Sequence, residues 1–181
     1  PNNPTGSFVK KEERDRIVAE ARARQIPIIV DEVFSAFSFA RDDRRADSFA
    51  GTGSTLTFTI NGLSKLLGLP QMKLAWIVVS GPDDECAKAL QRLEVIADTY
   101  LSVGTAVQQV LPRLLSDRET MSENILIRTR SNYESLRAVC AAGSPATLFQ
   151  CEGAWNALLR LPAKKSDEEW ALEFLQNAGV L

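Results

Sequence analysis

Three short segments of the sequence carry side chains suited to chemistry. Residues 1–6 form a turn rich in proline and glycine, and a rigid turn there would fix an Asn side chain so that its NH2 group can donate to a bound oxygen. Asp31 ends a short apolar run, and Lys65 follows a second run rich in β-forming residues. A carboxylate in a partly dry crevice can hold a cationic nitrogen, and a desolvated lysine amine can form a Schiff base with a carbonyl.

Each of these residues also has an ordinary structural interpretation. Turns before helices are common, Asp31 could cap a helix or pair with a lysine, and most lysines are solvated surface charges. The sequence has no histidine, so a catalytic base must be Lys, Asp, Glu, Tyr or Cys. Its three cysteines have unrelated spacings and no CxxC pair, so we predict neither a disulfide framework nor a metal site.

The elements that would position these residues alternate between strands and helices. The apolar run at 26–30 predicts a strand buried on both faces, as in a parallel sheet covered by helices. Ser7 is predicted to cap a helix that runs to about residue 25. The sequence further predicts strands at 56–60, 74–79, 146–150 and 154–161, a loop at 41–53, helices at 83–96, 105–115 and 122–141, and a last helix with a capping box from Ser166 to Glu169.

The composition is typical of a globular protein. The chain has 181 residues, of which 45% are hydrophobic and 24% charged, and its formal net charge is -2. This balance gives no indication of a nucleic-acid partner, and no apolar run is long enough to span a bilayer. Unpaired cysteines and the lack of an export signal favour a cytoplasmic location. The start within a turn, and an end that reads as a helix cap at Gly179 followed by the first residues of a strand, predict an internal fragment.

Three motifs, taken in order, point to a known family. They read Pro-Asn-Asn-Pro-Thr-Gly at 1–6, Asp-Glu-Val-Phe at 31–34 and Leu-Ser-Lys-Leu-Leu-Gly-Leu-Pro at 63–70. Over its whole length the chain resembles the class I/II aminotransferases of fold type I, which depend on pyridoxal 5'-phosphate (PLP). The resemblance implies an α/β fold: residues 1–110 would be the C-terminal part of a mostly parallel PLP-binding sheet domain with helices on both faces. Residues 111–181 would be part of a smaller α+β domain.

Matched position by position, the resemblance also implies roles for individual residues. Asn3 would donate to the phenolic oxygen of the cofactor, and Asp31 would pair with its pyridine nitrogen. Lys65 would form the internal Schiff base and, once displaced by the amino substrate, act as the general base. Lys73 stands where the family has a phosphate-binding arginine, and lysine neutralises a phosphate only as a point charge.

Two further positions depart from the family pattern. Phe34 has no hydroxyl where the family often has a tyrosine that touches the phenolic oxygen, and Gly62 replaces a serine that often contacts the phosphate. Ser64, directly before Lys65, could supply a hydroxyl instead. We expect weaker retention of the cofactor but the same chemistry.

The implied function is transfer of an amino group between an amino acid and a 2-oxo acid, in a homodimer that builds each active site from two subunits. Tyr100 and residues 102–105 lie where family members approach the neighbouring subunit, whereas Trp76, Trp155 and Trp170 are predicted to be core or interface residues. Two alternatives stay open. One is a PLP-dependent C–S lyase or decarboxylase of the same fold. The other is a catalytically incomplete fragment that serves only folding or association, because the substrate-carboxylate arginine and the ring-stacking aromatic are expected outside these residues.

Overall fold

A three-stranded sheet in the order β1-β2-β3 lies at the centre of this computed structural model, which describes residues 1–180. β1 (Ile28–Asp31) runs parallel to β2 (Thr57–Gly62), and β2 runs antiparallel to β3 (Ala75–Ser80). The three strands predicted for this half of the chain are therefore confirmed, with bounds shifted by one or two residues. Within residues 1–180, the other edge of β1 has no partner strand.

The prediction that β1 is buried on both faces is wrong for the described chain. Ile29 is 72% exposed, whereas Ile28 and Val30 are half-buried. Successive side chains of a strand point to opposite faces, so only one face of β1 packs against the rest of residues 1–180. A continuous apolar run predicts a strand with both faces covered, but residues 1–180 cover only one face of β1.

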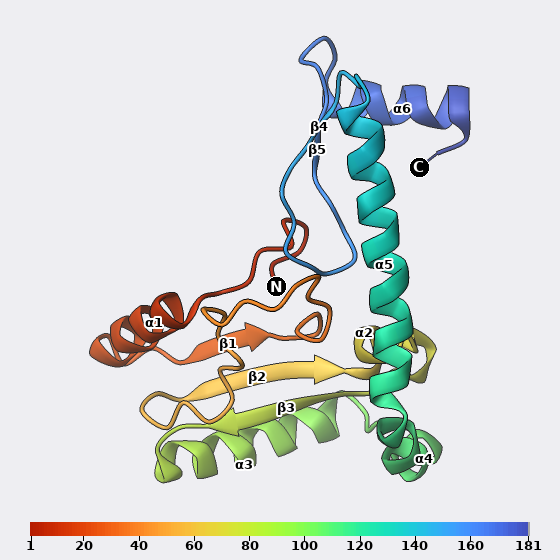
Figure 1. Ribbon diagram of the computed structural model, residues 1–181. Coiled ribbons are helices and arrows are strands. Elements are labelled where there is room, and N and C mark those ends of the chain that lie inside the picture. The colour runs from red at the N-terminus through yellow and green to blue at the C-terminus, as the bar shows by residue number, and fades with distance from the viewer. Residues whose placement is uncertain (181) are drawn as a thin grey trace.

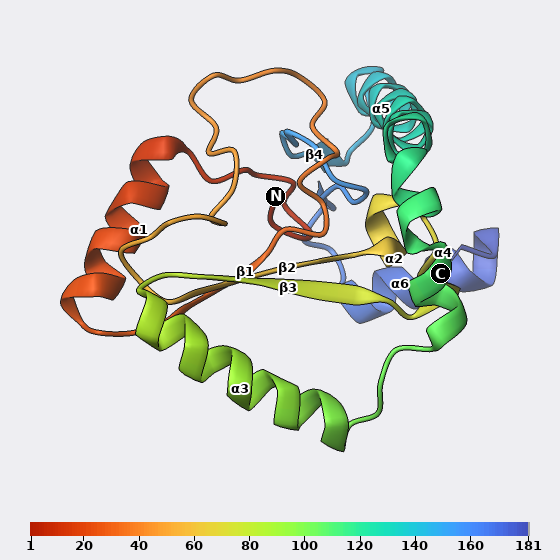
Figure 2. The same ribbon diagram turned by 90° about the horizontal axis from the view of Figure 1, so that it is seen from below.

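Helices lie on both sides of the sheet (Figure 2). α3 (Asp83–Thr99) runs along one side next to β3, while α1 (Lys11–Ala23) and the long loop after β1 lie toward the other. The chain between β2 and β3 forms the short helix α2 (Leu63–Leu66) and the 3-10 turn η1 (Pro70–Met72). The predicted helices at 83–96, 105–115 and 122–141 are confirmed as α3, α4 (Thr105–Ser116) and α5 (Arg118–Ala141).

The first helix begins later than predicted. Its N-cap is Lys10 rather than Ser7, because the residues before Lys11 are held in an extended conformation. The Val9 carbonyl accepts a 3.0 Å hydrogen bond from the Ala46 backbone N–H, and Lys10 forms a β-bridge with Arg45. These contacts with a distant segment prevent the helix from starting at Ser7.

Beyond α5 the chain forms a short hairpin and a last helix. The long strands predicted at 146–150 and 154–161 are wrong, since β4 (Thr147–Leu148) and β5 (Leu159–Arg160) have two residues each. The loop between them extends back beside α5 toward the N-terminus (Figure 1). There the Ala154 backbone N–H donates to the Phe37 carbonyl at 2.7 Å, so tertiary contacts replace the expected hairpin pairing.

The last helix, α6 (Asp167–Ala178), has the predicted capping box. The Ser166 side chain accepts from the Glu169 backbone N–H at 3.2 Å, and Gly179 ends the helix in the left-handed conformation with a φ of 62°. The predicted strand start after Gly179 reaches Leu181, which lies outside the described residues. No helix among residues 1–180 is both long and apolar enough to cross a membrane.

Two apolar clusters meet near the ends of β1 and β2. The first, here the Phe34 cluster, contains Phe34, Phe37 and Ala154, with Trp155 packed against it. The second, here the Leu63 cluster, contains Leu63, Leu67 and Leu74 and is covered by side chains of α4 and the start of α5.

Candidate functional site

Asp31 and Lys65 lie at the same end of the sheet, where β1 and β2 finish. Because β1 and β2 are parallel, their carboxyl ends lie together, and Asp31 is in register with Ile60. The Asn61 side chain fastens these ends: its Nδ2 donates to the Glu32 carbonyl at 3.2 Å. α2 begins directly after β2 and carries Lys65. The sheet therefore brings the predicted carboxylate and the predicted amine to its carboxyl end, as their positions in the sequence indicated.

Lys65 projects from α2 toward aromatic rings. Leu63 and Leu67, four residues apart and so on one side of the turn, are buried in the Leu63 cluster. The Lys65 Nζ lies 5.9 Å from the ring centroid of Phe34 and 5.5 Å from that of Trp155. Both distances are within the range of a cation–π interaction, so these rings form the surroundings of the amine.

Trp155 is a core residue, as predicted, and also a neighbour of the candidate amine, which was not predicted. Its ring centroid lies 5.5 Å from that of Phe34 and 5.3 Å from that of Phe37, both in edge-to-face geometry. Phe34, which replaces the tyrosine of the family pattern, is 6% exposed and fills the space beside Lys65 with an apolar ring.

Asp31 opens onto a cavity of about 670 Å³. Its Oδ1 accepts a 3.0 Å hydrogen bond from the Val33 backbone N–H, which fixes the carboxylate just beyond β1. Asn3, Asp31 and Phe34 are among the residues that line this cavity, whereas Ser64, Lys65 and Lys73 are not. Phe34 is the residue common to the two places, since it lines the cavity and its ring lies 5.9 Å from the Lys65 Nζ.

The turn that carries Asn3 is held by its own hydrogen bonds, as the sequence predicted. The Gly6 N–H donates to the Asn2 carbonyl at 2.8 Å, and the Thr5 hydroxyl donates to Asn2 Oδ1 at 2.9 Å. The Asn3 side chain itself accepts a 2.8 Å hydrogen bond at Oδ1 from the Nδ2 of Asn156. Asn156 lies 153 residues further along the chain, on the loop that extends back beside α5.

Ser64 and Lys73 flank the start and end of the connection between β2 and β3. The Leu63 N–H donates to the Leu74 carbonyl at 3.0 Å. Ser64 and Lys73 adjoin these two leucines, so the hydrogen bond brings them to the same end of the sheet. Ser64 is half-buried and Lys73 is exposed, with a left-handed φ of 52°. These two residues lie on the segment that also carries Lys65.

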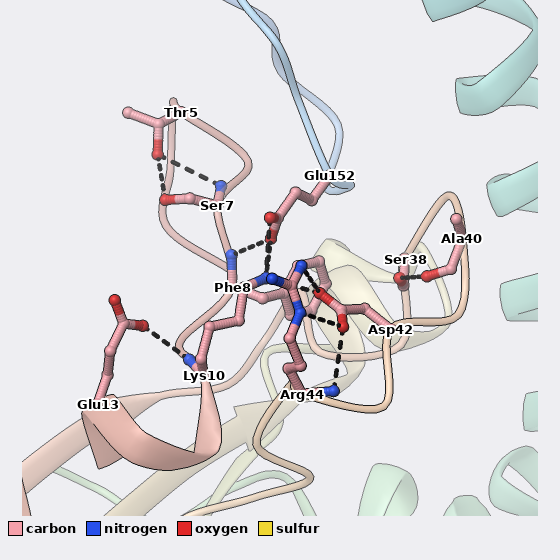
Figure 3. Close-up of polar contacts among 10 residues, drawn as sticks. All are labelled: Thr5, Ser7, Phe8, Lys10, Glu13, Ser38, Ala40, Asp42, Arg44 and Glu152. Atoms are coloured by element: carbon pink, nitrogen blue, oxygen red, sulfur yellow. Dashed lines mark hydrogen bonds and ion pairs between the residues drawn. The ribbon is translucent and has the colours of Figure 1, made fainter.

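A charged network ties the returning loop to the start of the chain (Figure 3). Glu152 accepts hydrogen bonds from the Phe8 backbone N–H and from Lys10 Nζ, both at 2.8 Å. Lys10 Nζ also lies 3.3 Å from Asp42, whose carboxylate is held by Arg44. Burial pushes the pKa of Glu152 upward, but the hydrogen bonds from Lys10 and Phe8 outweigh it and hold that pKa below its ordinary value.

Sequence reasoning missed the residues of this returning loop. Glu152 and Asn156 meet Lys10 and Asn3 across 142 and 153 positions of sequence, and Trp155 packs on Phe34 and Phe37 from the first half of the chain. No local pattern specifies such contacts. The sequence does show one sign of an irregular loop: polar and aromatic residues are mixed around Gly153, whereas a regular strand would alternate apolar and polar residues.

Comparisons with known proteins agree with the resemblance. A sequence model described as "Aminotransferase class I and II" matches residues 1–181. Over 189 residues the chain is 32% identical to the glutamate-pyruvate aminotransferase AlaA of Escherichia coli, and this covers all of the chain and 46% of that protein. An aminotransferase structure from E. coli superposes with a TM-score of 0.84 at 26% identity, and an alanine aminotransferase from Pyrococcus furiosus with 0.85 at 21%. Both structures are covered to 46% and match the whole chain, so the chain spans about half the length of its relatives.

Proposed function

Because the chain belongs to the aminotransferase class I and II family, we propose that the whole protein transfers an amino group between an amino acid and a 2-oxo acid with PLP as cofactor. The observation that carries this proposal is the placement of Lys65. Its amine lies beside the rings of Phe34 and Trp155, and α2, which carries it, follows β2 at the carboxyl end of the sheet where β1 ends in Asp31. PLP chemistry needs two groups from a protein, an amine that reacts with the aldehyde and a carboxylate that pairs with the ring nitrogen, and both lie at this end of the sheet.

The residues present fit the cofactor in type and space. The cavity of about 670 Å³ lies within the range of small-molecule sites, and it combines a carboxylate and an amide with an apolar ring. Lys65 and Lys73 add two amino groups on the neighbouring segment, one suited to react with an aldehyde and one to neutralise a phosphate. When bound, PLP supplies an aldehyde that reacts with amines and a ring that withdraws electrons from the substrate α-carbon.

Lys65 would have two tasks. Its Nζ would hold the cofactor covalently at rest, and a substrate amine would displace it. The freed amine would then take the proton from the substrate α-carbon, as general base, and give it to the C4' carbon of the cofactor, as general acid. The rings of Phe34 and Trp155 exclude water from one side of this amine and limit its movement, which keeps the proton transfer local.

Other residues would hold the cofactor in place. Asp31 engages one oxygen with the Val33 N–H, which leaves the other oxygen to accept from a protonated ring nitrogen. Asn3 would donate to the phenolic oxygen. Ser64 and Lys73 would contact the phosphate, Lys73 through charge alone because its ammonium lacks the fork of a guanidinium.

Glutamate and pyruvate are the first substrates to test. The relative with 32% identity is named a glutamate-pyruvate aminotransferase, and a relative from Mycobacterium tuberculosis is named an alanine aminotransferase. These names support the pair glutamate plus pyruvate, giving 2-oxoglutarate and alanine. The residues that would select the substrate carboxylates are expected outside the chain, so its own sequence adds nothing to this choice.

We further propose that residues 1–110 belong to a large cofactor-binding domain with a mostly parallel sheet, and residues 111–181 to a smaller domain. Support comes from α5, which leads away from the sheet and carries β4, β5 and α6 at its far end (Figure 1). A homodimer is supported by the apolar surface after α3, where Tyr100 is 80% and Leu101 86% exposed. Sedimentation of the full-length protein measures that state directly.

The experiment that tests the function uses the full-length protein. Borohydride reduction of the PLP-loaded protein, followed by peptide mapping, should place a single adduct on Lys65. The Lys65→Ala variant should lose amino transfer from glutamate to pyruvate by several orders of magnitude, while the substitution leaves the fold intact. Release of ammonia and pyruvate from a cysteine S-conjugate, with no 2-oxo acid added, would instead identify a C–S lyase. A Lys65→Ala variant with normal turnover would refute the assigned role.

A further inference from the structure

The segment at 151–156 packs against the turn at 1–8 through three separate contacts. Gly6 lies so close to Cys151 that a Cβ on the glycine would be 2.1 Å from the cysteine Sγ. Glu152 accepts from the Phe8 backbone N–H. Asn156 donates from Nδ2 to Asn3 Oδ1 at 2.8 Å. The residues in contact are 144 to 153 positions apart in sequence, so the tertiary fold brings the two segments together.

The contact with Asn156 determines how the Asn3 amide is oriented. An asparagine side chain has an acceptor oxygen and a donor NH2 group on opposite sides of one planar carbon. Because Oδ1 of Asn3 accepts from Asn156, its NH2 group must point away from Asn156. Asn3 also lines the cavity that Asp31 faces, so an oxygen of a molecule in that cavity can meet the donor side of the amide.

We propose that Asn156 is a positioning residue that fixes the Asn3 amide with its NH2 group toward the cofactor's phenolic oxygen. This inference rests on the proposed function, since it gives the Asn3 donor its ligand. Asn156 makes no contact with that oxygen itself and acts through Asn3. Glu152 and Cys151 pack on the start of the chain, and the Cys151 Sγ lies 3.6 Å from the Asn156 carbonyl oxygen, so the returning loop beyond α5 places Asn156 beside Asn3.

The proposal predicts unequal effects for substitutions of Asn156. Asn156→Asp keeps the shape but can only accept, so the Asn3 amide must turn over and present its oxygen to the phenolic oxygen. Asn156→Ala leaves the Asn3 amide free, and the cofactor can then select the donor orientation. Asn156→Ser retains a short donor. The expected loss of PLP affinity is roughly tenfold or more for the aspartate, about threefold for the alanine, and less for the serine.

The experiment is a double-mutant cycle in the full-length protein. Each Asn156 variant is made alone and together with Asn3→Ala, and the PLP dissociation constant is measured by equilibrium dialysis. With Asn3→Ala present, the aspartate and alanine variants should bind PLP equally within about twofold, because the group through which they act is gone. The pH midpoint of the visible absorption of bound PLP should rise with Asn156→Asp and stay unchanged with Asn156→Ser, since loss of a donor raises the proton affinity of the acceptor.

Two results would overturn the inference while leaving the proposed function intact. One is a difference between Asn156→Asp and Asn156→Ala that persists when Asn3 is alanine, because the charge would then act on the cofactor without Asn3. The other is wild-type affinity in Asn156→Asp. If Asn156→Asp does not fold, the ordering of the serine and alanine variants decides in the same way. Failure of the wild-type protein to form a borohydride-stable adduct on Lys65 would overturn the proposed function itself.

Discussion

The ion pair between Lys10 and Glu152 gives the most quantitative test of how the returning loop is fastened. Glu152→Gln keeps the size of the side chain and can still accept from the Phe8 N–H, but it loses the charge that holds Lys10 at 2.8 Å. Lys10→Met keeps most of the aliphatic stem and removes the ammonium. The coupling between the two substitutions isolates the pair from the other contacts of each residue.

The exposure of the two side chains determines the size of this coupling. Hydrogen bonds to charged groups contribute about 1.5–3 kcal/mol when buried, and exposed ion pairs about 0.2–1 kcal/mol. The side chains of Lys10 and Glu152 are 24% and 36% exposed, which places the pair between these limits after solvent screening. We therefore expect a coupling of about 1 kcal/mol in the free energy of unfolding.

Urea unfolding of the full-length protein at neutral pH, followed by circular dichroism, measures this coupling. The matched control is the pair Glu20 and Arg24 on α1, whose side chains are 63% and 67% exposed, and whose coupling should stay below about 0.5 kcal/mol. A coupling for Lys10 and Glu152 no larger than that of the control would refute the view that this pair fastens the loop.

The same pair should respond to pH in a defined direction. Because the folded-state pKa of Glu152 lies below its ordinary 4.5, the carboxylate stabilises the fold above that pH and loses this effect as the pH falls through the folded value. Burial lowers the pKa of Lys10, but its hydrogen bonds to Glu152 and Asp42 outweigh this and raise it above 10.5, so its contribution is complete at neutral pH. The cost of Glu152→Gln should therefore be largest near pH 7 and shrink below pH 4.5.

Two further positions test a close backbone approach near the start of the chain and the cap of the last helix. Gly6→Ala should destabilise the protein by more than about 2 kcal/mol, because its Cβ would lie 2.6 Å from the Gly153 carbonyl oxygen at a φ of 71°; urea unfolding as stable as the wild type would contradict this close approach. Ser166→Ala should cost about 1 kcal/mol through the lost cap of α6, seen as faster hydrogen exchange in its first turn, and Ser166→Asp should restore protection.

Local patterns in the sequence were sufficient to predict the elements that present Asp31 and Lys65. β1 comes from a short apolar run and β2 from a run rich in β-forming residues, polar residues mark the end of each, and parallel pairing places those ends together. The capping box at Ser166 was likewise readable, because both of its partners lie within one helical turn. Wherever the determining contact is local, the prediction and the structure agree.

The predictions that failed depend on contacts between distant segments. Ser7 has the chemistry of a cap, but its hydroxyl lies 2.9 Å from that of Thr5, and the chain stays extended to Lys10. The backbone N–H of Phe8 donates to the Glu152 side chain, where a helix start was expected. The backbone N–H of Ala154 donates to the Phe37 carbonyl, where a strand was expected. No spacing rule encodes these contacts, because they depend on where the loop beyond α5 comes to rest.

The unpaired edge of β1 bears on how the protein can be prepared. A strand edge with free N–H and C=O groups, next to an isoleucine that is 72% exposed, is a template for strand addition between molecules. Residues 1–181 produced by themselves would therefore tend toward aggregation and inclusion bodies, even with the contacts around Lys65 correctly formed. A preparation in which this edge of β1 is covered gives the sample in which ligand affinities can be interpreted.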